Sequence, residues 1–295
     1  MTAPTFTAAL VQTSSGDDLA ANIAAAERAI RQAVDRGADV VLTPENLLLM
    51  SPNRQATLAN ARGEAEHEGL ARMAVLAREA GIWLLLGSLH VRLEGADAES
   101  GRLANRSYLI DPEGAIAARY DKIHMFDVAL AGGESYRESA TFRPGEQAVL
   151  APTPWGVFGL TVCYDLRFPA LYRTLAQAGA AFLTVPSAFT RQTGPAHWHA
   201  LLRARAIETG CYVLAPAQCG TPVPGRDTFG HSLIVSPWGE VLADGGEEPG
   251  AVLAEIDPAA VARARAAIPS LTHDRPFAPP APVAWTDEAP ERARA

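Results

Sequence analysis

The segment Gly159–Arg173, GLTVCYDLRFPALYR, carries the pattern that decides the fold class. Its first residues are mostly apolar and predict a buried strand over residues 157–162, which ends immediately before Cys163. A helix is predicted to follow over residues 168–178. A strand that leads into a helix is typical of α/β folds, in which short apolar strands alternate with helices.

The same alternation extends in both directions along the chain. Further strands are predicted at residues 6–11, 38–43, 82–91, 180–185, 211–217 and 252–256. Further helices are predicted at residues 19–36, 64–80 and 196–209, and a short one begins at Pro258. Antiparallel hairpins are predicted around the turns at residues 111–114, 152–156 and 236–239. Because hairpins add antiparallel strands, the sequence predicts an α/β fold with mixed sheets.

The chain is expected to form one domain, residues 1–276, followed by a tail rich in Pro and Ala at residues 277–295 that packs poorly by itself. Residues 125–141 form a long polar stretch that is predicted to be a loop. Loops of that length in a compact domain are usually functional or mobile.

The composition excludes several classes of protein. The chain has 295 residues and a formal net charge of −8 without a basic run, which argues against nucleic acid as a partner. Its longest apolar runs, such as residues 82–86, are too short to cross a bilayer, so no membrane partner is expected. The three cysteines form no disulfide framework and the first residues lack the basic region of a secretory signal, so we expect a cytoplasmic protein.

The basic residues are distributed unevenly, because Lys122 is the only lysine among 25 lysine and arginine residues. Lysine carries a compact ammonium, whereas arginine is planar and bulky. A single lysine in such a chain reflects either a chemical requirement or an accident of composition.

Lys122 is one of three polar residues that follow predicted strands, together with Glu45 and Cys163. Ligands in α/β folds tend to bind at the carboxyl ends of strands. Glu45 is expected to be partly desolvated, which would raise the pKa of its carboxyl toward that of a general base. The alternative is an exposed loop carboxylate or a helix cap.

Cys163 lies where a strand turns into a helix, near N–H groups that would stabilise a thiolate. Lys122 beside it would lower the pKa of the thiol further and then stabilise an oxyanion. The alternatives are a structural cysteine for Cys163 and a surface position for Lys122. Together with Glu45, the two residues would supply the base, electrophile and nucleophile of acyl transfer.

Other candidates are weaker. Cys219, which ends a predicted strand, is a weaker candidate for the nucleophile than Cys163, and Cys211 is expected to lie inert in the core. His197 and His199 are two residues apart on a predicted helix and therefore point to different faces, which is poor geometry for a metal. No cysteine pair has zinc-type spacing and no glycine-rich segment matches a nucleotide-binding fingerprint, so neither a metal nor a cofactor is expected.

The segments TPENLLLM, RYDKIHMFDV and GLTVCYDLRFPALYR contain Glu45, Lys122 and Cys163 in that order. They resemble motifs of the nitrilase (carbon–nitrogen hydrolase) superfamily, and the resemblance covers residues 5–276. It implies a four-layer α-β-β-α sandwich with two mixed sheets and a catalytic triad formed by these three residues. A further segment, SYRESATFRPG, resembles the one that carries the second active-site glutamate of the superfamily, here Glu138.

The resemblance also implies a mechanism. Cys163 would attack the amide carbon after Glu45 accepts its proton, and a thioester on the cysteine would then be hydrolysed. The Lys122 ammonium and the backbone N–H of Tyr164 would hold the oxyanion. Glu138 would orient Lys122 and the substrate amide.

Three further residues are expected to bind the substrate. Arg167, four residues after the cysteine, is a candidate for binding a carboxylate through a bidentate fork. An ion pair with Asp165 or another acid is the alternative for this arginine. Phe189 and Thr190 follow a predicted strand and are expected to line the same pocket.

Within the superfamily, residues 185–220 resemble the Nit1-like branch, whose members hydrolyse the amide of deaminated glutathione to 2-oxoglutarate and Cys-Gly. The resemblance therefore implies a small-molecule amide substrate and a homodimer or higher homo-oligomer. Three alternatives remain: an omega-amidase that acts on 2-oxoglutaramate or another small-amide amidase, a metal-dependent hydrolase that uses His197, His199 and a cysteine, and a binding module without catalytic activity.

Overall fold

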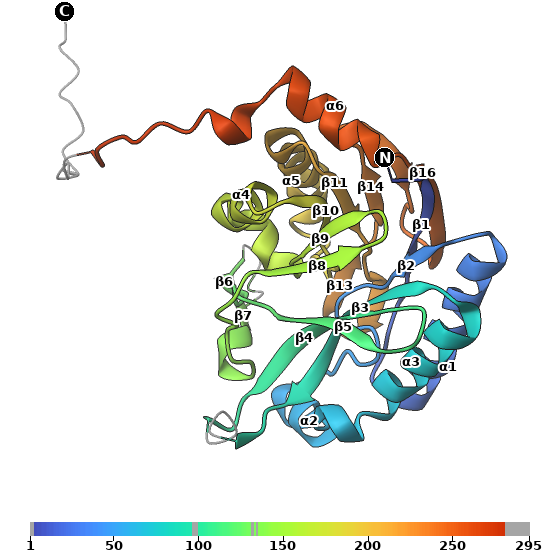
Figure 1. The fold of residues 1–295 in the computed structure, drawn as a ribbon. Helices are drawn as coiled ribbons and strands as arrows, with labels where there is room; N and C mark the ends of the chain where they lie inside the picture. The colour runs from blue at the N-terminus through green and yellow to red at the C-terminus, as the bar shows by residue number, and fades with distance from the viewer. Residues whose placement is uncertain (1–2, 96–99, 131–132, 134, 281–295) are drawn as a thin grey trace, which may run out of the picture.

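Two six-stranded sheets lie face to face at the centre of the molecule (Figure 1). The computed structural model describes residues 3–95, 100–130, 133 and 135–280. The first sheet has the order β16-β1-β2-β3-β4-β5 and the second has the order β15-β14-β11-β10-β9-β8. The strands of the first sheet are β1 (Phe6–Gln12), β2 (Val40–Leu42), β3 (Trp83–Arg92), β4 (Leu103–Ile110), β5 (Ile116–Asp121) and β16 (Gly250–Ile256). Those of the second are β8 (Val149–Thr153), β9 (Gly156–Leu160), β10 (Ala180–Thr184), β11 (Tyr212–Ala215), β14 (Leu233–Val235) and β15 (Val241–Asp244).

Both sheets are mixed, as the sequence predicts. In each sheet three adjacent strands run parallel, namely β1-β2-β3 and β9-β10-β11. The remaining pairs, toward both edges of each sheet, are antiparallel.

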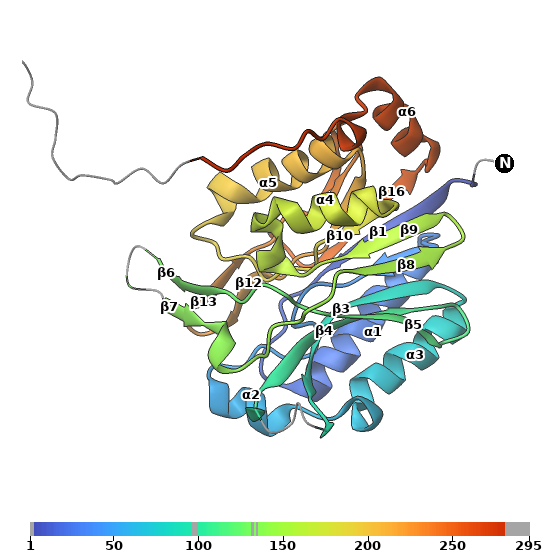
Figure 2. The same cartoon turned by 60° about the vertical axis from the view of Figure 1, so that its left-hand side comes forward.

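Helices cover the outer faces of the two sheets (Figure 2). Helices α1 (Leu19–Asp35) and α3 (Glu68–Ala80) lie against the first sheet, and α4 (Pro169–Gln177) and α5 (Gly194–Thr209) lie against the second. The order helix–sheet–sheet–helix is the predicted four-layer sandwich, which is therefore confirmed. The shorter helices are α2 (Arg54–Asn60) and α6 (Ala259–Ala267), with 3-10 turns η1 (Glu64–Glu66), η3 (Glu138–Ala140), η4 (Cys163–Arg167) and η5 (Ser270–Thr272).

The layers follow from the alternation of side chains along each strand, because successive residues of a strand point to opposite faces. In β1, Ala8 and Leu10 join the core between the two sheets, whereas Ala9 and Val11 join the core beneath α1 and α3. Each central strand is therefore apolar on both faces, which explains its continuous apolar sequence.

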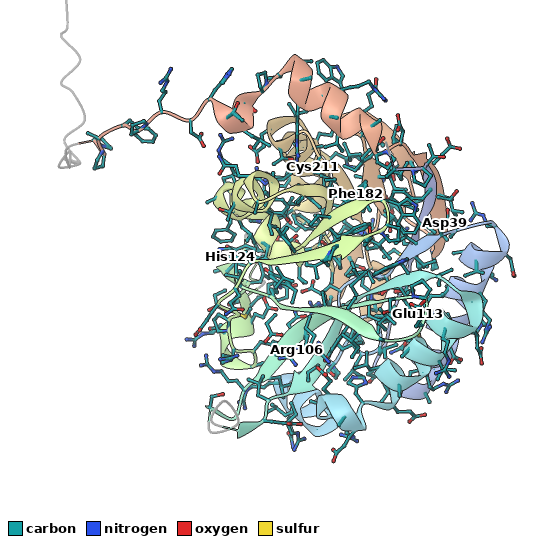
Figure 3. All side chains as sticks on the ribbon, viewed as in Figure 1. Asp39, Arg106, Glu113, His124, Phe182 and Cys211 are labelled. Atoms are coloured by element: carbon teal, nitrogen blue, oxygen red, sulfur yellow. The ribbon has the colours of Figure 1, made fainter. Side chains whose placement is uncertain are left out.

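Aromatic side chains connect the two sheets. Phe6 of β1 meets Phe182 of β10 edge to face, with ring centroids 5.4 Å apart. Phe182, labelled in Figure 3, also packs against Phe158 of β9, with ring centroids 4.9 Å apart. These contacts bury large apolar surfaces between the sheets and hold the sandwich together.

Most predicted elements are present within a few residues of their expected bounds, but the helix predicted over residues 64–80 is divided. Residues 64–66 form the 3-10 turn η1, and α3 begins at Glu68. His67 separates the two with an extended backbone, and its Nδ1 accepts a hydrogen bond from the N–H of Leu70 as a helix cap.

Helix α2 and two small hairpins were not predicted. One hairpin, β6 (Asp127–Ala129) with β7 (Ser135–Arg137), lies within the stretch that was predicted to be a loop. The other, β12 (Cys219–Val223) with β13 (Arg226–Phe229), contains Gly220, Pro222 and Pro224 in or beside its strands. Glycine and proline are depleted in strands, so local propensity conceals this hairpin.

In the described parts of the chain, no helix is long and apolar enough to cross a membrane. Of the predicted tail, residues 277–280 are exposed and have no regular structure. Residues 281–295, as well as 131, 132 and 134 of the predicted loop, lie outside the described residues.

Candidate active site

Glu45 lies just beyond the carboxyl end of β2 and is 3% exposed. Its Oε1 accepts hydrogen bonds from Lys122 Nζ at 2.9 Å and from Asn105 Nδ2 at 3.0 Å, and its Oε2 accepts one from the backbone N–H of Ala188 at 2.9 Å. Burial by itself would raise the pKa of this carboxyl, but the adjacent Lys122 ammonium lowers it below its ordinary value. The predicted rise in pKa is therefore wrong, because strand position alone does not reveal the ammonium.

Lys122 follows β5 and is 2% exposed. Its Nζ lies 2.9 Å from Glu45 Oε1 and 2.8 Å from Glu138 Oε2. Burial would lower the pKa of this ammonium, but the negative charges of Glu138 and Glu45 raise it above its ordinary value. Lys122 is therefore a buried cation between two carboxylates.

Asn105 joins the two carboxylates and was not predicted. Its Nδ2 donates to Glu45 Oε1 at 3.0 Å and to Glu138 Oε1 at 3.1 Å, and its main-chain carbonyl accepts from the backbone N–H of Lys122. Glu138 is also held by the backbone N–H of Phe126, which donates to Oε2 at 2.6 Å. The sequence signal that could have identified Asn105 is an amide side chain inside the mostly apolar strand β4, where it is buried.

Cys163 begins the turn η4 and has a φ of +47°, in the left-handed region that non-glycine residues rarely adopt. Its N–H donates to the carbonyl of Pro186 at 2.9 Å, which holds the strained turn. The backbone N–H of Tyr164 lies in the first turn of η4, where donors have no partner within the helix.

The Cys163 thiol is buried and lies near the Glu45 carboxylate, close enough for the two groups to change each other's pKa. Burial and the negative charge of Glu45 raise the pKa of the thiol, and they outweigh the opposite effect of Lys122. The predicted lowering of the thiol pKa is therefore wrong. At neutral pH the resting site holds a thiol, an ionised carboxylate and an ammonium.

Asp165, which is fully buried, fixes the turn that carries Cys163. Its Oδ2 accepts from Tyr120 Oη at 2.7 Å and from the N–H of Val162 at 2.8 Å. Its Oδ1 contacts the N–H and Nδ1 of His124, which Figure 3 labels, at 3.0 and 2.7 Å. The carboxylate thus ties β5 and the segment after it to the turn at Cys163.

A cavity of about 400 Å³ opens onto these groups. Glu45, Lys122, Glu138 and Cys163 line it, and the predicted substrate-binding residues Arg167, Phe189 and Thr190 line it as well. Cys211 and Cys219 are buried and do not line it. The structure therefore brings together all of the side chains that the sequence analysis proposed for catalysis and binding.

Arg167 points into the cavity and pairs with no acid among the residues that the structure describes. Its Nη1 lies 3.2 Å from His197 Nδ1, and its guanidinium carbon lies 5.2 Å from the ring centroid of Phe189. Asp165 is occupied by the partners named above, so the ion pair considered as an alternative for Arg167 is not formed with it.

In the described part of the lining there are three further arginines, none of which was predicted: Arg54, Arg137 and Arg226. They come from α2, β7 and β13, which are the elements that local patterns failed to predict. Among the described residues, the acids that line the cavity are Glu45 and Glu138, and both are bound to Lys122, so the described lining carries an excess of positive charge. A cavity of this kind favours an anionic ligand.

The histidine pair considered for a metal is separated. His197 faces Arg167, whereas His199 Nε2 lies 3.1 Å from Asp244 Oδ2, next to His231. Among the described residues, the group of side chains able to hold a metal is His199, His231 and Asp244, whose ligand atoms lie within 4.8 Å of one another. This group contains no cysteine and does not line the cavity.

Comparison with known families defines the class of protein. The carbon–nitrogen hydrolase family model matches residues 7–266, so the chain belongs to the carbon–nitrogen hydrolase family. It is therefore a hydrolase of carbon–nitrogen bonds, as the sequence analysis predicted.

Individual relatives narrow this class to amidases. The deaminated glutathione amidase of Synechocystis sp. is 42% identical over 271 residues, which cover 91% of this chain and 97% of that relative. Nit3 of Saccharomyces cerevisiae, a member of branch 10 of the nitrilase superfamily, has a similar structure with a TM-score of 0.82 and 30% identity, covering 92% and 97% of the two chains.

An amidase from Nesterenkonia sp. AN1 is similar with a TM-score of 0.74 and 28% identity, covering 89% and 94% of the two chains. In a mutant of that amidase, the active-site cysteine carries the acetamide moiety of fluoroacetamide. This chain is thus an amidase with the nitrilase fold.

Proposed function

We propose that the protein hydrolyses the amide of deaminated glutathione to 2-oxoglutarate and Cys-Gly through a thioester on Cys163. One observation carries the chemistry: the Glu45 carboxylate binds the Lys122 ammonium at 2.9 Å, and both groups line the same cavity as the Cys163 thiol. A base, a cation and a nucleophile are thereby joined at the edge of one cavity. The substrate assignment rests on the name of the relatives that are 42% identical to this chain.

In this proposal the first half of the reaction transfers the acyl group to the enzyme. Cys163 Sγ attacks the amide carbon while its proton moves to Glu45. The Lys122 ammonium and the Tyr164 N–H hold the oxyanion, and removing one such donor typically costs about 3 kcal/mol of transition-state stabilisation. The tetrahedral intermediate then breaks its C–N bond, and the amine leaves with the proton from Glu45.

The second half hydrolyses the thioester. Glu45 takes a proton from water, the resulting hydroxide attacks the thioester carbon, and the same oxyanion site holds the negative charge. When the C–S bond breaks, the proton returns from Glu45 to the Cys163 sulfur and the carboxylic acid leaves. The enzyme ends in its starting state, and one water has been consumed for each amide cleaved.

The electrostatics of the site suit this sequence of proton transfers. The lowered pKa of Glu45 keeps it ionised and ready to accept the thiol proton. The raised pKa of Cys163 keeps the nucleophile protonated until substrate is bound. Lys122 holds the two negative groups together without losing its own proton, because its pKa is raised. Glu138 orients Lys122 by accepting one of its hydrogen bonds.

We further assign the carboxylate of the 2-oxo acid to Arg167. Its guanidinium lines the cavity and contacts the rings of Phe189 and Tyr164 at 5.2 and 6.0 Å, which limits its motion without neutralising its charge. Phe189 and Thr190 provide the adjacent wall. An omega-amidase that acts on 2-oxoglutaramate would use the same carboxylate contact and is the second candidate.

We propose that the protein acts in the cytoplasm as a homodimer. Exposed apolar side chains support self-association: Ile207 of α5 lies close to Gly239 in the turn between β14 and β15, and Trp238, Val241 and Leu242 are exposed at the same turn and strand. An apolar patch of this kind on a folded protein commonly marks an interface. Light scattering of the purified protein and of an Ile207→Glu variant tests this, and a monomeric wild type contradicts it.

The experiment that tests the chemistry is acyl trapping. Cys163→Ala is expected to show no turnover of deaminated glutathione, whereas Cys211→Ala, matched in residue type, keeps turnover. Intact-mass measurement of the wild type during turnover of a slow amide is expected to show an acyl adduct, which Cys163→Ala lacks. Full activity of Cys163→Ala contradicts the mechanism.

A further inference from the structure

A second arginine, Arg226, reaches the cavity from an element that has no role in the mechanism above. It is the first residue of β13, it is half-buried, and it lines the cavity. Burial is the main cause of the lowered pKa of His90, and Lys122 is the main cause of the lowered pKa of Glu45; the positive charge of Arg226 adds to both effects. The part of the chain that the structure describes offers Arg226 no acidic partner within ion-pair distance.

A row of aromatic rings separates Arg226 from Arg167. The guanidinium carbon of Arg226 lies 5.9 Å from the ring centroid of Tyr136. The ring centroids of Tyr136 and Phe126 lie 5.1 Å apart. Phe126 lies 5.0 Å from Tyr164, and Tyr164 lies 6.0 Å from the guanidinium carbon of Arg167. The two cations therefore stand at the two ends of one aromatic wall.

The middle of this wall adjoins the reacting groups. The N–H of Phe126 donates to Glu138, which binds Lys122, and Tyr164 directly follows Cys163. A ligand that lies along this wall from one arginine to the other therefore passes the segment that carries the nucleophile.

The hairpin β12–β13, which carries Arg226, is hydrogen-bonded to the segment 189–191, whose residues Phe189 and Thr190 line the cavity. Thr228 bridges Thr190, and the N–H of Phe229 donates to the carbonyl of Phe189 at 2.9 Å. The carbonyl of Asp227, next to Arg226, accepts from the N–H of Arg191 at 3.0 Å. The position of Arg226 is thus set by the same segment that lines the acyl side of the site.

We propose that Arg226 binds a carboxylate on the leaving-amine side of the substrate, so that the enzyme selects amides with one carboxylate on each side of the scissile bond. This inference rests on the proposed function and deepens it. Deaminated glutathione has this form, because its 2-oxo acid carries one carboxylate and the glycine end of the departing dipeptide carries the other. 2-Oxoglutaramate carries only the first.

The side assignment follows from the two ends of the aromatic wall. In the proposed function Arg167, at one end of the wall beside Tyr164, holds the carboxylate of the acyl group. Arg226 lies at the other end, beside Tyr136, and therefore faces the group that departs with the amine. An arginine there binds a carboxylate bidentately at the far end of the departing amine, while Arg167 holds the acyl group.

The test compares two substrates on matched variants. Arg226→Gln is expected to lower kcat/KM for deaminated glutathione by about 10- to 100-fold, the range for one hydrogen-bonded charge contact, mainly through KM. The same variant is expected to change kcat/KM for 2-oxoglutaramate by less than about threefold, because that substrate has no second carboxylate. Arg226→Lys is expected to recover part of the loss because it restores the charge.

Two control variants identify the side on which each arginine acts. Arg167→Gln is expected to lower the rates on both substrates, since both carry the acyl-side carboxylate. Arg191→Gln, on the exposed surface beside the same hairpin and paired with Glu247, is expected to change neither. Calorimetric binding of both amides to Cys163→Ala, with and without Arg226→Gln, measures the contact without turnover.

The outcomes distinguish an error in the proposed substrate from an error in the proposed role of Arg226. A wild type that hydrolyses 2-oxoglutaramate but not deaminated glutathione overturns the proposed substrate. A wild type active on deaminated glutathione whose Arg226→Gln variant is unchanged, or loses activity equally on both substrates, overturns only the assignment of Arg226. Loss confined to deaminated glutathione, with weakened binding to Cys163→Ala, supports the assignment.

Discussion

Replacing Lys122 by Met should destabilise the fold and reverse the pH dependence of folding stability that the active site contributes. The ammonium lies 2.9 Å from Glu45 and 2.8 Å from Glu138, and all three side chains are buried or nearly so. Removing one partner of a buried ion pair costs about 3–5 kcal/mol, because a charge is left unpaired in a poorly solvated place. Lys122→Met leaves two such charges close together, since Asn105 Nδ2 contacts both carboxylates.

The sign of the pH dependence follows from the pKa of Glu45. In the wild type this pKa is lowered by Lys122, so the interaction stabilises the fold above about pH 4.5 and is lost as the pH falls through the pKa of the folded state. In Lys122→Met, burial and the neighbouring Glu138 raise the pKa of Glu45 above its unfolded value. The folded variant then binds more protons than the unfolded chain, so its stability falls as the pH rises above about 4.5.

Urea denaturation followed by circular dichroism at pH 5 and pH 7.5 measures both effects. Arg72→Met, which breaks the exposed ion pair with Glu27, is the control and should cost less than about 1 kcal/mol at either pH. Lys122→Arg keeps the charge, so it should lose less stability than Lys122→Met, yet be nearly inactive because the wider guanidinium does not fit the same place. A Lys122→Met variant within about 1 kcal/mol of the wild type at pH 7.5 would refute this reasoning. A Lys122→Arg variant that keeps most of its activity would refute the requirement for lysine.

Three further predictions concern residues around the triad. Asn105→Ala should lower kcat by roughly tenfold or more, because a hydrogen bond to a charged group contributes about 1.5–3 kcal/mol; steady-state kinetics measure this, and unchanged kcat speaks against a positioning role. Asp165→Asn should lower the free energy of unfolding by about 3 kcal/mol, because one carboxylate oxygen that accepts hydrogen bonds is replaced by an NH2 group that faces other donors. A thermal melt close to that of the wild type contradicts this. The pH profile of kcat/KM should stay level from about pH 6 to pH 9, since Glu45 has a lowered pKa and Lys122 a raised one. An acidic limb centred above about pH 6 is incompatible with Glu45 as the ionised base.

The sequence alone determined the fold class and the positions of the main candidate residues. The alternation of apolar residues along β1 and the apolar stripe of α1 are local patterns. The residues that end these elements, such as Gly37 after α1 with a φ of +87°, are local signals as well. The segments around Glu45, Lys122 and Cys163 are also local, which is why their resemblance to carbon–nitrogen hydrolases was readable and was confirmed by the family match.

Only the tertiary structure decided what these residues do to one another. Glu45 and Lys122 are 77 positions apart in the chain, and their contact depends on β2 and β5 ending at the same edge of one sheet. The directions of the pKa shifts of Glu45 and Cys163 were predicted wrongly, because burial and a neighbouring charge act in opposition and their balance depends on distance. Asn105 and Arg226 were missed for the same reason: a strand amide and a hairpin arginine acquire meaning only from the groups that the fold brings within reach of them.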